Sequence, residues 1–145
     1  MDNVGIVVED LGGAIAFFET LGLALQGGRQ HVEGSWVDRT VGLDGVRVEI
    51  AMMQTPDGHS RLELTKFHAP AVISAEPKHA PPNTLGIRRI MFAVDDIKDV
   101  VARLKAHGGE VLDEVAQYED KYLLCYLRGP EGIIVALAEP LGSPP

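Results

Sequence analysis

One four-residue pattern occurs twice in the chain, in the same setting each time. Val8-Glu9-Asp10-Leu11 returns as Val94-Asp95-Asp96-Ile97, 86 positions further on. Each copy follows a short apolar run rich in β-branched residues, which is typical of a buried strand. In each copy the second acid can cap an amphipathic helix, and the helical pattern ends at glycine, first at Gly22 and then at Gly108-Gly109. The repeat predicts two copies of one structural unit.

The segments after each helix repeat as well. Residues 23–25, 46–53 and 61–67 have strand patterns in the first copy, and residues 110–115, 118–127 and 133–139 have them in the second. Turn sequences join the last two strands of each copy, so both pairs are expected to form antiparallel hairpins. Residues 34–39 have no clean period and are expected to form a short turn or helix. We therefore predict an α+β chain with two tandem βαβββ modules.

A proline-rich segment separates the two modules and sets their boundaries. Module one is assigned to residues 1–68, a linker to 69–85 and module two to 86–141, because four prolines between positions 70 and 82 deny the linker regular structure. A sheet in each module cannot bury both faces under one helix. The two sheets are therefore expected to face each other or to form one curved mixed sheet, a half-barrel around a cavity.

Charge and cysteine content narrow the function. The chain has 145 residues and a formal net charge of -8, which argues against a nucleic-acid partner because phosphate binding needs clustered Lys and Arg. The lone Cys125 cannot form an internal disulfide and is expected to be a small buried hydrophobe. No stretch has the roughly 18 apolar residues that span a bilayer, and the first residues do not resemble a secretion signal. We expect a protein of the cytoplasm without membrane association.

The quoted segments together resemble a known group of proteins. The opening run to Leu11, Phe17-Phe18, Leu62-Glu63-Leu64, residues 93–97 and Gly129-Pro130-Glu131-Gly132 are similar to the vicinal oxygen chelate superfamily, which includes glyoxalases, bleomycin resistance proteins and extradiol dioxygenases. The resemblance covers nearly the whole chain. It implies the glyoxalase-like fold, a homodimer, and a pocket that holds a divalent metal in the enzymes of the group.

The resemblance also indicates which positions would hold that metal. Carried over to this chain, they fall on Asn3 and Glu63 in module one and on Arg89 and Ala136 in module two. Glu63 alone is a strong ligand, Arg89 would add a fixed positive charge, and Ala136 has no donor atom. We therefore expect no cofactor. Recruitment of a divalent metal by His31, His59 or His68 is the less favoured alternative.

Glu63 and Arg89 each allow two interpretations. Glu63 is either a catalytic base or ligand in the pocket, or one partner of an ion pair with Arg89. Arg89 either lies in the pocket, where it could bind a carboxylate or phenolate or stabilise an enolate, or lies at a solvated strand end. Both are retained as candidate catalytic residues, and seven residues form the predicted ligand-binding set: Trp36, Met52, Glu63, Arg89, Met91, Tyr118 and Tyr122.

Two functions are compatible with this sequence. The favoured hypothesis is a metal-free protein of the glyoxalase/bleomycin resistance type that binds a small apolar or aromatic molecule, with antibiotic resistance by sequestration as the biological role. The alternative is a glyoxalase-like enzyme, namely a lyase, an isomerase or a dioxygenase. The ligand set at Asn3, Arg89 and Ala136 favours the first hypothesis.

Overall fold

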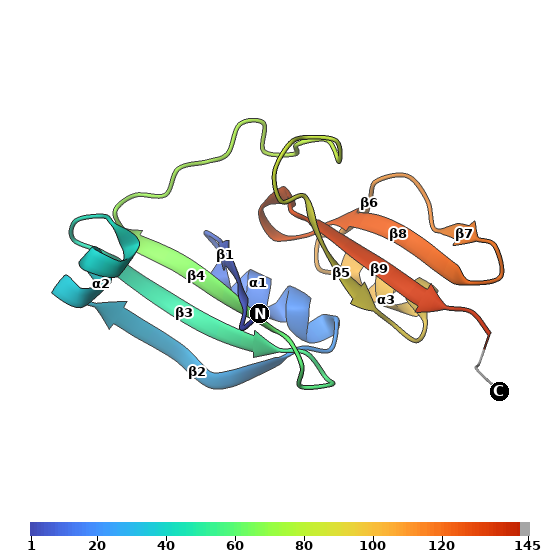
Figure 1. The fold of residues 1–145 in the computed structure, drawn as a ribbon, viewed down its shortest axis with the longest axis horizontal. Helices are drawn as coiled ribbons and strands as arrows, with labels where there is room; N and C mark the ends of the chain where they lie inside the picture. Colours follow the sequence, from blue (N-terminus) through green and yellow to red (C-terminus); the bar gives the residue numbers. More distant parts are fainter. Residues whose placement is uncertain (143–145) are drawn as a thin grey trace. The chain divides into compact units, whose positions relative to one another are not determined.

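The computed structural model describes residues 1–142, and the chain divides into two compact units. The first, Met1–Ser74, contains one sheet and two helices (Figure 1). Its elements in chain order are β1 (Val4–Val7), α1 (Leu11–Thr20), β2 (Ala24–Glu33), α2 (Ser35–Val41), β3 (Arg47–Gln54) and β4 (Arg61–Ala69).

The first sheet has the strand order β1-β4-β3-β2. β1 is parallel to β4, whereas β3 is antiparallel to both of its neighbours. β2 contains a bulge between Gln26 and Arg29, where Gly27 and Gly28 both have a positive φ. Glycine is favoured at such positions because other residues meet a steric penalty there.

Helix α1 covers one face of this sheet. Asp10 caps it by accepting a hydrogen bond from the backbone N–H of Gly13 at 2.9 Å. Phe17 and Phe18 pack edge to face, with ring centroids 5.2 Å apart, and both are almost fully buried. Buried side chains of this size contribute about 1.5–3 kcal/mol each. The predicted cap, helix and glycine end are confirmed.

Helix α2 covers part of the opposite face. Its Val37 is 4% exposed and packs with Val46 and Val48, against which partly buried apolar side chains of the sheet also pack. Figure 1 shows α2 at the end of the sheet where β3 begins. Asp38 fixes the following loop, because its carboxylate accepts hydrogen bonds from the backbone N–H groups of Gly45 and Val46, at 3.0 and 2.8 Å.

The second unit, Ala75–Pro145, repeats this plan in the part that the structure describes. Its sheet has the order β5-β9-β8-β6, with β7 paired to β8. β5 is parallel to β9, and β8 is antiparallel to β9, as β1, β4 and β3 are in the first unit. Its elements are β5 (Arg89–Ala93), α3 (Ile97–Lys105), β6 (Glu110–Val111), β7 (Ala116–Tyr118), β8 (Tyr122–Arg128), a 3-10 turn (Pro130–Gly132) and β9 (Ile134–Pro140). The predicted α+β duplication is therefore confirmed.

Helix α3 covers one face of the second sheet. Asp96 caps it through the backbone N–H of Asp99, at 3.2 Å. The helix buries Ile97, Val100, Val101 and Leu104. The face of the sheet that this helix covers contains four buried residues of β8 and β9, namely Cys125, Leu127, Val135 and Leu137. Burial raises the pKa of the Cys125 thiol, in keeping with the predicted role as a small buried hydrophobe. No helix among residues 1–142 is long and apolar enough to cross a membrane.

The observed strands add to or differ from the predicted ones at three places. β2 extends to Glu33, where the sequence indicated only that a strand begins at residues 23–25, and β6 has two residues instead of the six expected. The strand predicted over residues 118–127 is divided into β7 and β8 by a turn in which Lys121 N–H donates to the Tyr118 carbonyl at 3.1 Å. Glu119 adopts a left-handed φ of 50° in this turn, which alternation of side chains does not reveal.

Part of the predicted linker is fixed to the second unit. Arg128 donates hydrogen bonds to the carbonyls of Gly132 and Ala80, at 2.9 and 2.8 Å. Lys78 lies 3.7 Å from Glu131, nitrogen to oxygen. The contact is close at Gly132, where an added Cβ would lie 2.6 Å from His79 Cδ2. The linker assigned to residues 69–85 therefore contains the boundary between the units, after Ser74.

This contact predicts the effect of adding one methyl group. Gly132→Ala should lower the free energy of unfolding by about 2–4 kcal/mol, since it combines a positive φ of 74° with a clash against His79. Gly108→Ala is the matched control, because Gly108 has a φ of 86° and open space around its Cβ position, and should cost about 1 kcal/mol. Chemical denaturation measures both. Equal losses would contradict the packing of residues 78–80 on this turn.

Candidate functional site

Each sheet has one face without a long covering helix. The residues opposite one another in the strand pairing share a face, so the register defines these surfaces. We call the face opposite α1 the open face of unit 1, defined by Gly5, Ile50, Met52, Glu63 and Thr65. We call the face opposite α3 the open face of unit 2, defined by Arg89, Met91, Tyr122, Leu124, Tyr126 and Ala136.

Glu63 lies in the middle of the open face of unit 1. Its register neighbours are Met52 on β3 and Gly5 on β1. The space beside it is open, because a Cβ added at Gly5 would meet no atom within 4 Å. Glu63 is partly buried and has no hydrogen bond or ion pair with the other residues of unit 1. The structure therefore brings together two residues of the predicted set, Met52 and Glu63.

Asn3 lies just before β1, and its side chain already forms a hydrogen bond. Its side-chain Nδ2 donates to Asp2 Oδ2 at 2.8 Å, and Asp2 also forms an ion pair with Arg61. The hydrogen bond from Asn3, followed by the contact with Arg61, holds the pKa of Asp2 below its usual range. Asn3 therefore belongs to a polar group at the edge of the sheet.

Arg89 on β5 reaches across the open face of unit 2. Its Cζ lies over the ring of Tyr126, 5.1 Å from the centroid. In the sheet order β5-β9-β8, β9 separates these two residues. On β9 the register places Ile134 opposite Arg89 and Ala136 between Met91 and Tyr126, so Arg89 reaches the ring diagonally past Ala136. Since Ala136 carries only a methyl group, the long arginine side chain can pass over the strand to the tyrosine ring.

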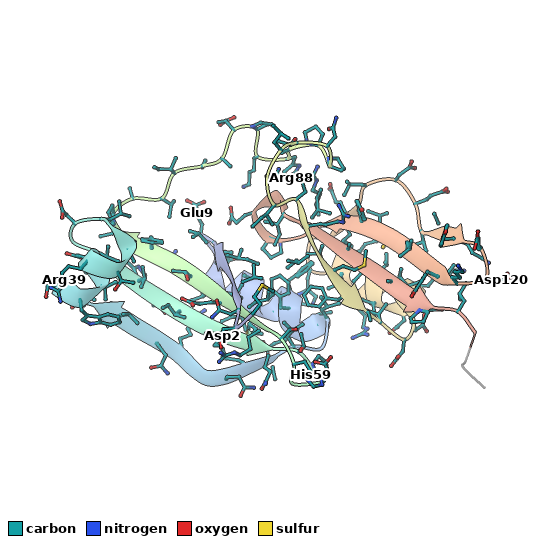
Figure 2. All side chains as sticks on the ribbon, in the orientation of Figure 1. Asp2, Glu9, Arg39, His59, Arg88 and Asp120 are labelled. Atoms are coloured by element: carbon teal, nitrogen blue, oxygen red, sulfur yellow. The ribbon has the colours of Figure 1, made fainter. Side chains whose placement is uncertain are left out.

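The rest of this face is apolar and aromatic. Met91 is 52% exposed, and Tyr118 and Tyr122, which face each other across the β7–β8 hairpin, are 52% and 41% exposed. Figure 2 labels Asp120 at the tip of this hairpin. The remaining predicted ligand-binding residue, Trp36, belongs to unit 1, where it is 58% exposed on α2 and its ring lies against Gly34.

The four positions that the resemblance assigns to a metal offer few donor atoms, and each unit is considered by itself. Unit 1 supplies one free carboxylate, Glu63, and an amide at Asn3 that is engaged with Asp2. Unit 2 supplies a guanidinium at Arg89 and a fully buried methyl group at Ala136. No three His, Cys, Asp or Glu side chains among residues 1–142 lie together in a way that could hold a metal ion. Neither a cation nor an alkyl group can donate electrons to a metal.

The histidines that could have been recruited lie elsewhere. His31 and His68 approach each other, with ring centroids 6.5 Å apart, on the face of the first sheet opposite to that of Glu63. His68 Nε2 is 2.7 Å from Glu49 Oε1, and Arg29 Nη1 is 3.7 Å from Glu49 Oε2. His59 lies on the β3–β4 turn, away from α2 and its Arg39 (Figure 2).

Two features of these surfaces were not predicted. The group formed by Arg29, His31, Glu49 and His68 arises because alternate residues of β2 share a face, and the sequence indicated only where this strand begins. Tyr126 was not among the predicted ligand-binding residues. Its signal is present in the sequence as the alternation of Tyr122, Leu124 and Tyr126 along β8, which places all three on one face.

Comparisons with known proteins identify the family and the fold of the chain. Residues 2–126 match the family model described as the Glyoxalase/Bleomycin resistance protein/Dioxygenase superfamily. The chain belongs to this superfamily, which confirms the resemblance inferred from the sequence. A search of curated proteins gave no match.

Solved structures show the same fold. A glyoxalase family protein from Bacillus cereus is 57% identical, with a TM-score of 0.92 over 98% of this chain and 94% of that one. A glyoxalase family protein from Enterococcus faecalis is 18% identical, with a TM-score of 0.62 and 96% of each chain covered. A glyoxylase/bleomycin resistance protein/dioxygenase domain from Frankia sp. EAN1pec is 16% identical, with a TM-score of 0.64 over 99% of this chain and 93% of that domain. The last two are similar in fold alone.

The contacts of Glu49 predict an acid-dependent stability. The hydrogen bond from His68, with the nearby charges of Arg29 and His31, lowers the pKa of Glu49 below its usual 4.5. A lowered native pKa stabilises the fold above pH 4.5, and this contribution is lost as the pH falls through the lowered value. Glu49→Gln should therefore make stability fall less steeply below pH 4.5 in denaturation experiments.

The partner residue provides the control for this experiment. His68→Gln should reduce the acid dependence in the same direction, because it removes the main cause of the lowered pKa of Glu49. The double variant should add little to either single change, since both act on one interaction. Parallel curves for wild type and Glu49→Gln below pH 4.5 would refute the interaction.

Proposed function

We propose that this chain binds a small, largely apolar or aromatic molecule on the open sheet faces, without a metal. By sequestering that molecule it protects the cell against it. Such a role would make it a resistance protein in place of an enzyme. The proposal includes a cytoplasmic location and a homodimer, both of which the family resemblance and the sequence favour. Sedimentation of the purified chain tests the dimer.

The observation that carries the proposal is the pairing of Arg89 with Tyr126 over Ala136. This arrangement fills two positions that the resemblance assigns to metal ligands with a cation and a methyl group. A unit charge about 4 Å from another contributes about 4 kcal/mol at an effective dielectric constant near 20, and a divalent ion doubles the repulsion. Within unit 2, Arg89 and Ala136 themselves supply no donor atom that could offset this cost.

The surface around Arg89 supports an apolar ligand. Met91, Tyr118 and Tyr122 are all more than two-fifths exposed on one side of the second sheet. Removing apolar surface from water contributes roughly 25 cal/mol per Å², so covering about 200 Å² would contribute about 5 kcal/mol before the cost of association. Tyrosine and methionine suit flat, irregular ligands because they offer broad and adaptable contacts.

The first test uses a neutral fluorescent probe. N-Phenyl-1-naphthylamine should bind with enhanced emission, and Tyr122→Ala should weaken that binding by about tenfold because it removes apolar contact area. Leu43→Ala is the matched control, since Leu43 is 46% exposed but lies outside the predicted ligand set, and should change nothing. No binding of the probe to the wild type would contradict the proposal.

Metal dependence provides a separate test. Protein purified without added metal or chelator should contain less than about one-tenth of an equivalent of metal, and its melting temperature should not rise when Zn, Ni, Mn or Fe(II) is added. Near-stoichiometric metal with a specific rise in melting temperature would favour the alternative, a metal-dependent lyase, isomerase or dioxygenase. In that case Glu63→Gln should lower the metal content, because Glu63 is the strongest available ligand.

A further inference from the structure

Arg89 differs from Arg103, Arg128 and Lys121 of the second unit, whose charged groups each lie near an oxygen atom. The guanidinium of Arg128 donates hydrogen bonds to the backbone carbonyls of Gly132 and Ala80. Arg103 pairs with Asp99 at 3.0 Å, and Lys121 lies 3.6 Å from Glu119. Arg89, by contrast, has no carboxylate partner and donates no hydrogen bond among the described residues of unit 2, and its contact is the Tyr126 ring.

This contact leaves the hydrogen-bonding edge of the guanidinium available. A guanidinium has five N–H donors in its plane, whereas its interaction with an aromatic ring uses the positive charge above the ring. The Tyr126 ring also restricts the arginine side chain, so less conformational entropy is lost when a ligand is bound. A planar anion would match the paired donors in a bidentate arrangement.

The surroundings of Arg89 determine what else such a ligand must contain. Next to the cation lie Met91 and the ring of Tyr126, followed along β8 by Leu124 and Tyr122. These side chains offer apolar and aromatic contact beyond one cationic end. A phosphate-rich ligand is disfavoured, because the formal net charge of the chain is -8 and this face has one unpaired cation.

We propose that the open face of unit 2 binds aromatic carboxylates, with Arg89 holding the carboxylate and Tyr126, Met91 and Tyr122 contacting the ring. This inference rests on the proposed function, since it names the chemical class of the small molecule that the face takes. It assigns Tyr126 a double role. The tyrosine ring supports the guanidinium and provides apolar surface for the ligand.

Two probes of equal shape and different charge test the assignment. 2-Naphthoate carries the carboxylate, whereas 2-naphthamide is its neutral counterpart, and dissociation constants for both are measured by NMR titration. The wild type should bind 2-naphthoate about tenfold more tightly, as expected for a charge-assisted pair at an exposed arginine. Arg89→Gln should remove this preference while the affinity for 2-naphthamide changes less than about twofold.

Further variants separate charge from contact. Arg89→Lys should keep part of the preference, because lysine retains the charge but lacks the planar pair of donors. Tyr126→Leu should weaken the binding of both probes, and Tyr126→Phe should preserve both affinities. Lys98→Gln is the matched charge control, since Lys98 is exposed on α3, and it should leave the preference intact.

The outcomes distinguish this inference from the proposed function. Equal affinities for the two probes, or a preference that persists in Arg89→Gln, would overturn the assignment of a carboxylate ligand while leaving a neutral binding function in place. Failure of both probes to bind would overturn the assignment together with the proposed function. Retained binding of 2-naphthamide by Arg89→Gln shows that the variant is folded.

Discussion

Burial of one sheet face beneath one amphipathic helix is the interaction on which both units depend. α1 buries Phe17 and Phe18 on the first sheet, and α3 buries Ile97 and Leu104 on the second. These four are among the largest fully buried side chains, and a single helix of about ten residues can cover only one face. The opposite face of each sheet is consequently left for other contacts, which is where the candidate site lies.

The residues on the open face of unit 2 are mutually compatible. Arg89 can lie over Tyr126 because Ala136, on the strand between them, has a side chain that does not obstruct it. A larger side chain at Ala136 would separate the cation from the ring, and a carboxylate there would capture the guanidinium as an ion pair. Arg89, Ala136 and Tyr126 together place a cation on an aromatic surface, without a carboxylate partner among the described residues of unit 2.

Most of the fold could be predicted from local patterns. The paired acids before each helix, the glycines after them and the alternation in residues 46–53 and 61–67 identify elements that the structure confirms, because caps, turns and one-sided burial depend on neighbours in sequence. The sequence was insufficient where the extent of a strand or the position of a turn depends on residues that are distant in the sequence. β2 extends to Glu33 because it pairs with β3 along its length, and the Glu119 turn forms within what alternation alone reads as one strand.

The candidate site was predictable only in part for the same reason. Alternation placed Arg89 and Met91 on one face, and the register places Met52 beside Glu63. The pairing of Arg89 with Tyr126, however, joins residues on strands that are separated in the sequence by α3, β6 and β7. Similarly, His68 meets Glu49 on one face of the first sheet, a contact set by strand register and by a register shift at the start of β3.

The sequence by itself determined the duplication, the helix caps, the acidic charge and the residue types at the four positions that the resemblance assigns to a metal. These properties follow from the order and chemistry of the residues and need no knowledge of distant contacts. Tertiary structure alone decided which side chains meet: it placed Arg89 over Tyr126, left Glu63 without a partner in its own unit and joined residues 78–80 to the turn at Gly132. Strand order and register determine these contacts, because they bring together residues that no local sequence pattern relates.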